Sequence, residues 1–314
     1  MRDLRIVFMG TPDFAVAILK RLVEDNYTIV GVVTAPDKPA GRGRKITESA
    51  VKKYAKEQNL FLLQPTNLKS NDFINKLKEV KATLQVIVAF RMLPKIVWEI
   101  PIYGTFNLHA SLLPSYRGAA PIHWAIINGE EKTGVTTFFI DEKIDTGEII
   151  LQKEILIHKD EIVGELHDRL MVLGATLVSE TVANIRDNKV STQKQPKIDE
   201  KIAPKLFPEN CKINWEDSLD SIYNHIRGLN PFPAAWSEMN NNDGITTVKI
   251  YKVRKEKVAH TEIIKTIKTS KEEIKIAVKG GYIYIDELKI SGKKKLDSKS
   301  LLNGYAFSSN AEML

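Results

Sequence analysis

Two polar side chains at one predicted strand end are the residues whose types and spacing could do chemistry. Asn107 and His109 stand two positions apart in the segment NLHASLLP, residues 107–114. Side chains alternate along a strand, so both should point to the same side. An Asn amide and a His could together hold the oxyanion of a tetrahedral acyl-transfer intermediate, a role worth roughly 3 to 4 kcal/mol per donor. The alternative is a buried Asn and His that only satisfy hydrogen bonds inside the sheet.

A carboxylate that could assist them follows the next predicted strand. Asp145 lies in the segment DEKIDTGE, residues 141–148, directly after a run rich in β-branched and aromatic residues. This segment should loop over the carboxyl edge of the sheet, where ligands of open α/β sheets bind. A carboxylate there could pair with His109 and order a water for proton transfer. Asp141 suits a turn equally well, so composition alone does not choose between the two, and an ordinary turn residue is the alternative.

Other kinds of catalytic site are disfavoured by spacing. No G-x-S-x-G motif surrounds Ser111, and a serine two positions from His109 cannot readily adopt the geometry of a catalytic triad. The six histidines lack metal-ligand spacing and Cys211 is the only cysteine, so no metal site is predicted. Gly10 opens the segment GTPDF without the other two glycines of the dinucleotide fingerprint. We therefore interpret Gly10 as a strand-to-helix turn and expect no nicotinamide or flavin cofactor.

The elements that must position these residues form an α/β pattern. Apolar runs over 4–9, 28–34 and 84–90 alternate with helical patterns such as 14–24, which is typical of βαβ units around a parallel sheet. Runs that are apolar at successive positions suit strands covered on both faces. We expect further strands over 104–109 and 134–140 and one long amphipathic helix over 161–186.

The pattern changes after residue 188. Residues 189 to 208 are polar and carry three prolines, so we place an interdomain linker over 189–207, between domains 1–188 and 208–314. Beyond it, short alternating strands lie between clusters of Gly, Asn and Lys, and a small β-barrel is their natural closure. We expect a helix over 218–227 and strands that include 248–253, 274–278 and 282–285.

Length, composition and charge set the class of protein. The 314 residues exceed the usual domain of about 100 to 200, and 43% hydrophobic and 27% charged residues are typical of a globular protein. No run approaches the roughly 18 apolar residues of a membrane span, and no targeting segment is recognised at the N-terminus. With one cysteine, Cys211, expected in the core, a reducing cytoplasmic location and no membrane partner are predicted.

The net charge of +7 is unevenly distributed. Residues 249–299 contain 15 Lys and Arg against 7 Asp and Glu, a surplus of 8 that exceeds the charge of the whole chain. A basic second half indicates a polyanionic partner, because phosphate neutralisation releases counterions and so supplies affinity. A lysine-rich, solvated surface is the alternative.

The segment around Asn107 and His109 resembles a known family. The pattern N-x-H-x-S-L-L-P, followed by Gly118, Pro121 and the D-x-G of residues 145–147, is similar to the folate-dependent formyltransferases that use 10-formyltetrahydrofolate. Three further segments resemble members of this family that act on an aminoacylated tRNA, and they lie in both halves of the chain. They are GTPDFA at 10–15, PDKPAGRGRK at 36–45 and IRGLNPFPA at 226–234.

The resemblance implies a fold, a reaction and two substrates. It implies a Rossmann-like N-terminal formyltransferase domain with a parallel-containing sheet, and a C-terminal OB-like barrel that binds tRNA. It also implies that Asn107, His109 and Asp145 are catalytic, that 10-formyltetrahydrofolate donates the formyl group, and that the α-amine of a methionyl initiator tRNA accepts it. The enzyme is expected to be a monomer. By this likeness, tetrahydrofolate would contact Val88, Ala89, Phe90, Ser111, Leu112, Leu113 and Pro114, and the acceptor end of the tRNA would contact Arg42, Arg44 and Lys45.

One segment departs from the family pattern. Residues 89–94, AFRMLP, are shorter than the usual stretch and carry Arg91 where a small residue is common, which bears on the expected pteridine pocket.

Two other functions are compatible with much of the same sequence pattern. A formyltransferase for glycinamide ribonucleotide or an amino sugar would have the same three catalytic residues, and only the basic loop and the second domain argue against it. A catalytically inactive RNA-binding relative is disfavoured because all three polar residues are present.

Overall fold

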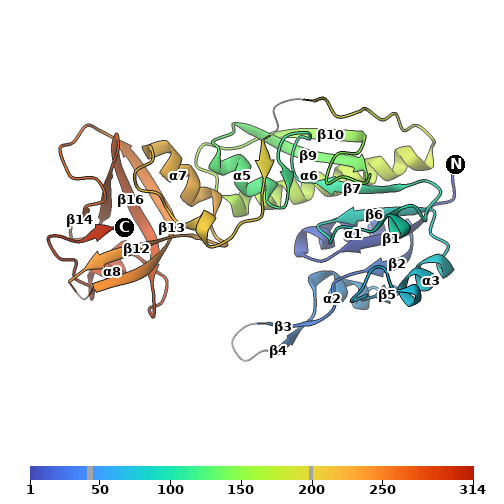
Figure 1. Cartoon of the computed structure of the whole chain (residues 1–314), viewed down its shortest axis with the longest axis horizontal. Helices are drawn as coiled ribbons and strands as arrows, with labels where there is room; N and C mark the ends of the chain where they lie inside the picture. Colours follow the sequence, from blue (N-terminus) through green and yellow to red (C-terminus); the bar gives the residue numbers. More distant parts are fainter. Residues whose placement is uncertain (41–44, 198–200, 243) are drawn as a thin grey trace. The chain divides into compact units, whose positions relative to one another are not determined.

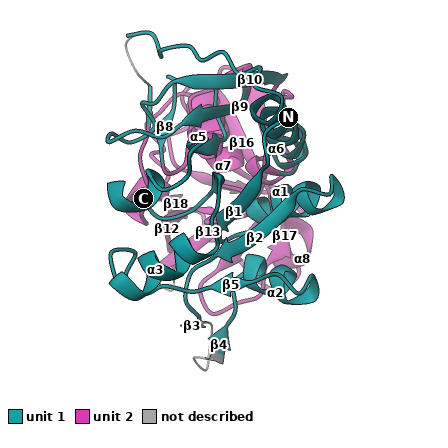
Figure 2. Cartoon of the chain, turned by 90° about the vertical axis from the view of Figure 1, so that its right-hand side faces the viewer, with its two compact units in different colours: residues 1–118, 134–155, 168–202 teal, residues 119–133, 156–167, 203–314 magenta. Residues whose placement is uncertain are grey.

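The computed structural model describes residues 1–40, 45–197, 201–242 and 244–314. These residues divide into two compact units, each assembled from several stretches of chain (Figure 2). Unit 1 comprises 1–118, 134–155 and 168–202, and unit 2 comprises 119–133, 156–167 and 203–314. Two stretches inside the predicted 1–188 domain therefore belong to the second unit, and the predicted linker and domain boundaries stay a prediction.

Unit 1 is built on a seven-stranded sheet (Figure 1). In spatial order the strands are β10 (Ile149–Leu156), β9 (Lys132–Phe139), β7 (Thr105–His109), β6 (Leu84–Val88), β1 (Arg5–Gly10), β2 (Thr28–Val33) and β5 (Leu62–Leu63). The five strands from β7 to β5 are parallel, whereas β9 is antiparallel to β7. The Rossmann-like, parallel-containing sheet is thus confirmed, and each strand predicted for it lies within two residues of its expected bounds.

Helices cover the sheet on both faces. The α helices that contribute to unit 1 are α1 (Asp13–Glu24), α2 (Ala50–Glu57), α3 (Asn71–Glu79), α4 (Lys95–Trp98) and α6 (Val163–Arg186), and its short strands are β3 (Lys38–Ala40), β4 (Lys45–Thr47) and β8 (Arg117–Gly118). The helices α2 and α3 begin after Ser49 and Ser70, whose hydroxyls accept backbone N–H bonds of the first turn. On one face, Val7 and Met9 of β1 belong to an apolar cluster with Phe73 of α3.

The opposite face is covered by α6, which runs alongside β7 and β9 (Figure 1). A Cβ at Gly174 of α6 would lie only 2.8 Å from the side chain of Leu108, so the helix approaches β7 closely. The hydroxyls of Thr181 in α6 and Thr137 in β9 are hydrogen-bonded at 2.8 Å. Because side chains alternate along a strand, Asn107 and His109 point away from the face that α6 covers.

The strand order creates a switch point at β1. The chain builds β2 on one side of β1 and later returns to place β6 on the other side, with Gly10 and Val88 paired at their carboxyl ends. Open α/β sheets bind ligands at such a point. The end of β7, with His109, lies on the next strand along. The fold therefore brings the predicted catalytic and folate-contacting residues to one edge of the sheet.

Unit 2 is a small antiparallel β-barrel with helices packed on it. Its strands, in spatial order, are β14 (Ile267–Thr269), β15 (Ile274–Val278), β16 (Gly281–Ile290), β13 (Gly244–Lys257), β12 (Ala235–Asn241) and β18 (Glu312–Met313), with β17 (Leu296–Asp297) beside β16. Thr266, next to β14, bridges to Glu312 of β18, so the two ends of the sheet meet. The barrel predicted from the sequence is confirmed.

Buried apolar side chains between Cys211 and Met313 fill the barrel. Trp215 and Cys211 are among its buried residues, as expected for Cys211. The remaining elements are α5 (Pro121–Ile127), α7 (Leu219–Gly228), α8 (Ser298–Leu302), the 3-10 helix Glu209–Cys211 and the short strand β11 (Ile202–Ala203). In the described part of the chain, no helix combines the length and apolarity needed to cross a membrane.

Candidate active site

Asn107 and His109 lie next to each other on one face of β7. The strand pairs with β6 on one side and β9 on the other, and Asn107 is opposite Phe138 of β9. The His109 side chain is 7% exposed, whereas Asn107 is half-buried. Within the described residues the Asn107 amide has no hydrogen-bond partner, so its N–H groups can serve a ligand.

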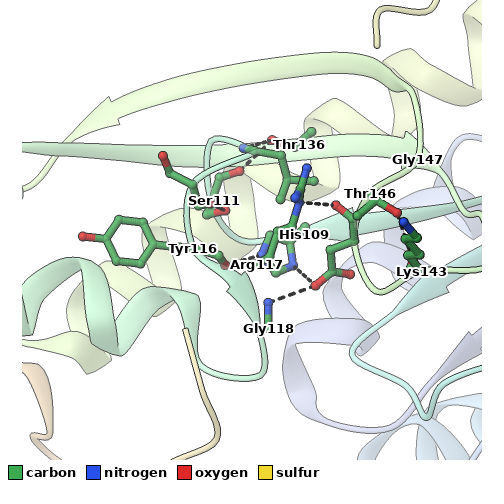
Figure 3. A network of polar contacts seen from close by, with 12 residues as sticks. His109, Ser111, Tyr116, Arg117, Gly118, Thr136, Lys143, Thr146 and Gly147 are labelled. Carbon is green, nitrogen blue, oxygen red and sulfur yellow. Dashed lines mark hydrogen bonds and ion pairs between the residues drawn. The ribbon is translucent and has the colours of Figure 1, made fainter. Parts of the chain in front are cut away.

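Both ring nitrogens of His109 face oxygen atoms. Nε2 lies 2.8 Å from the backbone oxygen of Tyr116, and Nδ1 lies 3.8 Å from Oδ2 of Asp145 (Figure 3). A carbonyl oxygen only accepts, so the Nε2–H group donates a hydrogen bond to the backbone oxygen of Tyr116. Nδ1 is the ring nitrogen that faces the Asp145 carboxylate.

The structure separates the two aspartates that the sequence left equivalent. Asp141 stabilises the loop itself, because its Oδ1 accepts bonds from the Lys143 backbone N–H at 3.0 Å and the Thr146 hydroxyl at 2.7 Å. Asp145 instead directs its carboxylate towards His109, and its Oδ2 also accepts from the backbone N–H of Gly118 at 3.0 Å. The Asp145 backbone has a φ of 55°, a left-handed conformation that non-glycine residues adopt infrequently.

Two contacts fix the loop that carries Asp145. A Cβ at Gly147 would lie 1.6 Å from the carbonyl oxygen of Phe139, so only glycine allows the loop to lie this close to β9. Lys95 of α4 forms an ion pair with Glu142 at 2.7 Å, and this hydrogen bond holds the pKa of the Glu142 carboxyl below its usual range. The carboxylate of Asp145 is therefore part of a defined loop.

Residues 111–114 form a rigid turn directly after β7. Ser111 is fully buried and donates its hydroxyl to the backbone oxygen of Ser115 at 2.6 Å. The hydroxyl of Thr136 donates to the backbone oxygen of Ser111 and accepts from the backbone N–H of Leu113 (Figure 3). The Ser111 hydroxyl and backbone oxygen are thus both engaged in holding the turn. Leu112 is half-buried, and Leu113 and Pro114 are buried.

The end of β6 supplies the second predicted contact segment. Val88 is buried, Ala89 is exposed with a φ of 46°, and Phe90 is half-buried. The guanidinium of Arg91 donates to the backbone oxygens of Thr66 and Pro65, at 3.2 and 2.7 Å, and lies 5.2 Å from the centre of the Phe90 ring. Arg91, the residue that departs from the family pattern, therefore ties the β6 loop to the segment after β5.

The basic loop predicted to meet the tRNA lies outside the described residues. This holds for Arg42 and Arg44, while the backbone of Lys45 begins β4. The hairpin of β3 and β4 that flanks the loop is held at its base by Lys52 of α2, whose ammonium lies 2.5 Å from Asp37 and 3.1 Å from Glu48. The hydrogen bond to Lys52 lowers the pKa of the Asp37 carboxyl.

Unit 2 contains a groove with a volume of about 780 Å³. Six basic side chains and three acidic ones line it, together with the rings of Tyr223 and Tyr251. The basic residues are Lys159, Arg227, Lys252, Arg254, Lys255 and Lys295. The groove accounts for part of the basic surplus seen in the sequence, and places it on the outer surface of the barrel around β13.

The groove is both structured and cationic. Burial lowers the pKa of Arg227, whose guanidinium donates to the backbone oxygen of Glu161 at 2.9 Å. Burial and a 2.8 Å hydrogen bond to Asp160 raise the pKa of the Tyr223 hydroxyl. Lys255 lies 4.6 Å from the centre of the Tyr223 ring. Cations beside aromatic rings are typical of surfaces that bind single-stranded nucleic acids.

The sequence did not identify two polar residues that reach the Asp145 loop. Arg117 follows the rigid turn, and Gln195 comes from the segment predicted as a linker, yet both donate to the backbone oxygen of Asp145 at 2.9 Å. No local signal could have revealed this contact, because Gln195 stands 50 residues from Asp145. Among the described residues no group of three His, Cys, Asp or Glu side chains is arranged to hold a metal ion.

A Rossmann-like sheet with a polar Asn–His–Asp cluster at its carboxyl edge, followed by a small barrel, defines a class of enzyme. A family model described as formyl transferase matches residues 4–182, and one described as formyl transferase, C-terminal domain, matches residues 205–306. The chain belongs to the formyl transferase family.

Relatives within the family carry a more specific name. The methionyl-tRNA formyltransferase of Flavobacterium johnsoniae is 55% identical over 314 residues, which is 100% of both chains. That of Flavobacterium psychrophilum is 56% identical over 98% of each chain. That of Bacteroides thetaiotaomicron is 50% identical over 99% of this chain and 98% of its own.

Solved structures of lower identity share the fold. The sugar 3N-formyl transferase WlaRD, determined with dTDP and 5-N-formyl-THF, has a TM-score of 0.65 at 21% identity and covers 94% of this chain and 100% of its own. HypX from Aquifex aeolicus, in complex with tetrahydrofolic acid, has a TM-score of 0.64 at 18% identity and covers 96% of this chain and 47% of its own.

Proposed function

We propose that this enzyme transfers the formyl group of 10-formyltetrahydrofolate to the α-amine of a methionyl initiator tRNA. One observation carries the choice of acceptor: the chain is 55% identical, over the full length of both proteins, to a methionyl-tRNA formyltransferase. The relatives whose solved structures contain dTDP or dTDP-3-aminofucose are only 21% and 22% identical, so they support the fold and not the acceptor. A role in translation initiation, in the cytoplasm and as a monomer, belongs to the same proposal.

In the proposed reaction, the amine of the methionyl group attacks the formyl carbon directly. A C–N bond forms, the carbonyl becomes an oxyanion, and the bond from the formyl carbon to N10 of the folate then breaks. The Asn107 amide, which lacks a partner in the described chain, donates a hydrogen bond to this oxyanion. A donor preorganised in this way is worth about 3 to 4 kcal/mol of transition-state stabilisation.

His109 and Asp145 stabilise the charge of the oxyanion and assist the transfer of the amine proton. Because Nε2 of His109 is bonded to Tyr116, the protonated ring acts on the oxyanion mainly through its positive charge, with Nδ1–H directed towards Asp145. The Asp145 carboxylate stabilises that charge and holds a water that takes the proton from the attacking amine and passes it to N10. The products are a formylated amine and tetrahydrofolate, so atoms and charge balance.

The folate is proposed to bind where β6 and β7 end. Val88 pairs with Gly10 on one side and Leu108 on the other, so Ala89 and Phe90 leave the sheet beside Asn107. The exposed backbone of Ala89 offers hydrogen-bonding groups to a planar ring, and the turn from Ser111 to Pro114 would form the opposite wall. The anchoring of Arg91 to the segment after β5 leaves this backbone to the ligand.

The tRNA is proposed to meet both units. Arg42, Arg44 and Lys45 would contact its acceptor end, and Lys52 holds the base of the β3–β4 hairpin through Asp37 and Glu48. The groove of unit 2 would bind phosphates elsewhere on the same molecule. Replacing Arg42 with Ala should weaken tRNA binding and reduce its salt slope by about one phosphate contact.

The direct test is a comparison of acceptors. The purified enzyme is incubated with 10-formyltetrahydrofolate and methionyl initiator tRNA, uncharged tRNA, glycinamide ribonucleotide or an amino-sugar nucleotide, and formylated product is measured. We expect formylation of the methionyl tRNA alone. Preferential formylation of a small amine would overturn the proposed acceptor, and tRNA binding without transfer to any acceptor would overturn the proposed catalysis.

A further inference from the structure

The backbone of Asp145 is held by two side chains that the catalytic proposal does not use. Its carbonyl oxygen accepts hydrogen bonds from Nε of Arg117 and Nε2 of Gln195, both at 2.9 Å. The same Gln195 nitrogen also donates to the carbonyl of Gly147 at 2.8 Å. The Gln195 amide thus spans the loop on both sides of Thr146.

Arg117 and Gln195 are also bonded to each other. Oε1 of Gln195 accepts from Nη2 of Arg117 at 2.5 Å and from its Nε at 3.1 Å. A neutral amide is the only side-chain group that can accept from a guanidinium and donate to two carbonyl oxygens at the same time. A glutamine at position 195 therefore satisfies the Arg117 guanidinium with its amide oxygen and the two loop carbonyls with its amide nitrogen.

The segment that carries Gln195 is fixed to the sheet just upstream. The backbones of Gln193 and Ile149 exchange two hydrogen bonds, at 2.8 and 2.9 Å, where β10 begins. The Thr192 hydroxyl donates to the carboxylate of Glu148. The Gln195 side chain consequently projects from a segment whose backbone is hydrogen-bonded to β10, although the sequence around it is polar and resembles a linker.

The other side of Asp145 is held by the residue next to Arg117. The Gly118 backbone N–H donates to Oδ2 of Asp145, the oxygen that lies 3.8 Å from Nδ1 of His109. Residues 117 and 118 therefore fix both the backbone and the carboxylate of Asp145. Gln195 completes this arrangement by holding the Arg117 guanidinium and the loop together.

We propose that Gln195 is a positioning residue for the formyl transfer, acting through Asp145. This rests on the proposed catalytic role of Asp145. Loss of the Gln195 amide removes a donor from the carbonyls of Asp145 and Gly147 and removes the Oε1 acceptor of the Arg117 guanidinium, so the loop shifts and the carboxylate leaves its place beside His109. Since a misplacement of about 1 Å can cost about a hundredfold in rate, we expect kcat to fall at least about tenfold while the KM for tRNA changes little.

The test uses one chemical change at two neighbouring positions. Gln195→Glu keeps the size of the side chain but directs a carboxylate at the carbonyls of Asp145 and Gly147, whereas Gln193→Glu makes the same change on an exposed side chain that bonds no other described residue. Gln195→Leu removes the amide altogether. For each variant, kcat and KM are measured from pH 5 to pH 8, together with thermal unfolding.

We expect Gln195→Glu to be defective near neutral pH and to recover in part, relative to the unmodified enzyme, as the pH falls, because the protonated carboxyl donates to one of the two loop carbonyls while its other oxygen accepts from Arg117. Gln193→Glu should match the unmodified enzyme throughout. Equal kcat values for the two Glu variants across the pH range would overturn the proposal, as would a rise in KM without a fall in kcat. If Gln195→Leu fails to fold, the pH profile of Gln195→Glu decides alone.

An Asp145→Asn variant measured in parallel separates this proposal from the function on which it rests. If Asp145→Asn is inactive and Gln195→Glu is fully active, only the positioning role fails. If Asp145→Asn retains full activity, the catalytic assignment of Asp145 fails first.

Discussion

Gly147→Ala offers a way to disturb the active site without removing any functional group. The added Cβ would lie 1.6 Å from the carbonyl oxygen of Phe139, whereas real Cβ atoms essentially never approach closer than 3.0 Å, so the loop and β9 must separate by about 1.4 Å. Asp145 is two residues away on the same loop. A shift of this size should lower the rate by about a hundredfold or more. Overpacking of the site should also cost about 1 to 3 kcal/mol of stability.

The assay is single-turnover formyl transfer at saturating formyl donor and methionyl tRNA. Gly304→Ala is the matched control, because a Cβ there meets nothing within 4 Å. We expect the control to match the unmodified enzyme, and Gly147→Ala to bind tRNA normally but react slowly. A folded Gly147→Ala variant with a rate within twofold of the control would refute the idea that the placement of this loop limits catalysis.

Four other outcomes are expected. Asp145→Asn should lower turnover sharply with little loss of tRNA affinity, and an unchanged single-turnover rate would contradict its assigned role. Lys252→Ala, in the groove of unit 2, should weaken tRNA binding most at low salt. The dependence of the binding constant on salt concentration should become shallower by about one phosphate contact, and a salt dependence equal to that of the unmodified enzyme would contradict this. Burial lowers the pKa of His123 and of His225 below 6.5, so the unfolded state binds more protons and stability should fall as the pH drops below that value, by up to about 1.4 kcal/mol per pH unit for each histidine. Urea unfolding between pH 7 and pH 5 measures this, and a slope unchanged by His225→Gln would count against the assignment. Trp215 is 1% exposed and donates its indole N–H to Ser237, so Trp215→Ala should cost about 3 to 5 kcal/mol in the same assay, and a loss below about 1 kcal/mol would contradict its place in the core.

Strands β1, β2 and β6 could be predicted because each reads as a largely apolar run, and the buried residues of β6 extend without interruption from Leu84 to Val88. The short strand β5 and the strand β10, which alternates between half-buried and exposed residues over most of its length, were not predicted. The long helix α6 was recognisable from its helical periodicity. The shorter helices α2 and α3 were not predicted: each buries one face, but they span only eight and nine residues, so the helical pattern extends over little more than two turns. Their capping residues, Ser49 and Ser70, were the available signals.

The candidate site was partly predictable from the regular geometry of a strand. The alternation of side chains along a strand is enough to place Asn107 and His109 on one side of β7. The choice between Asp141 and Asp145 depends on where a loop passes over the sheet, which the local sequence does not encode. The contact of Gln195 with that loop depends on how a segment 50 residues further along returns to β10. The catalytic roles themselves stay predictions until the variants are measured.

The alternation of the chain between its two units limits how the protein can be divided or recombined. Tyr223 and Arg227 of α7 depend on Asp160 and the backbone of Glu161, and the indole of Trp124 donates to the backbone of Pro204. A fragment that starts near residue 208 would lack these partners and leave a buried guanidinium without its acceptor, a costly loss. In a chimera of two relatives joined near residue 208, the two sides of these contacts would come from different parents. The stretch from 208 to 314 is therefore not a self-sufficient module, and a fragment that keeps unit 2 must also keep residues 119–133 and 156–167.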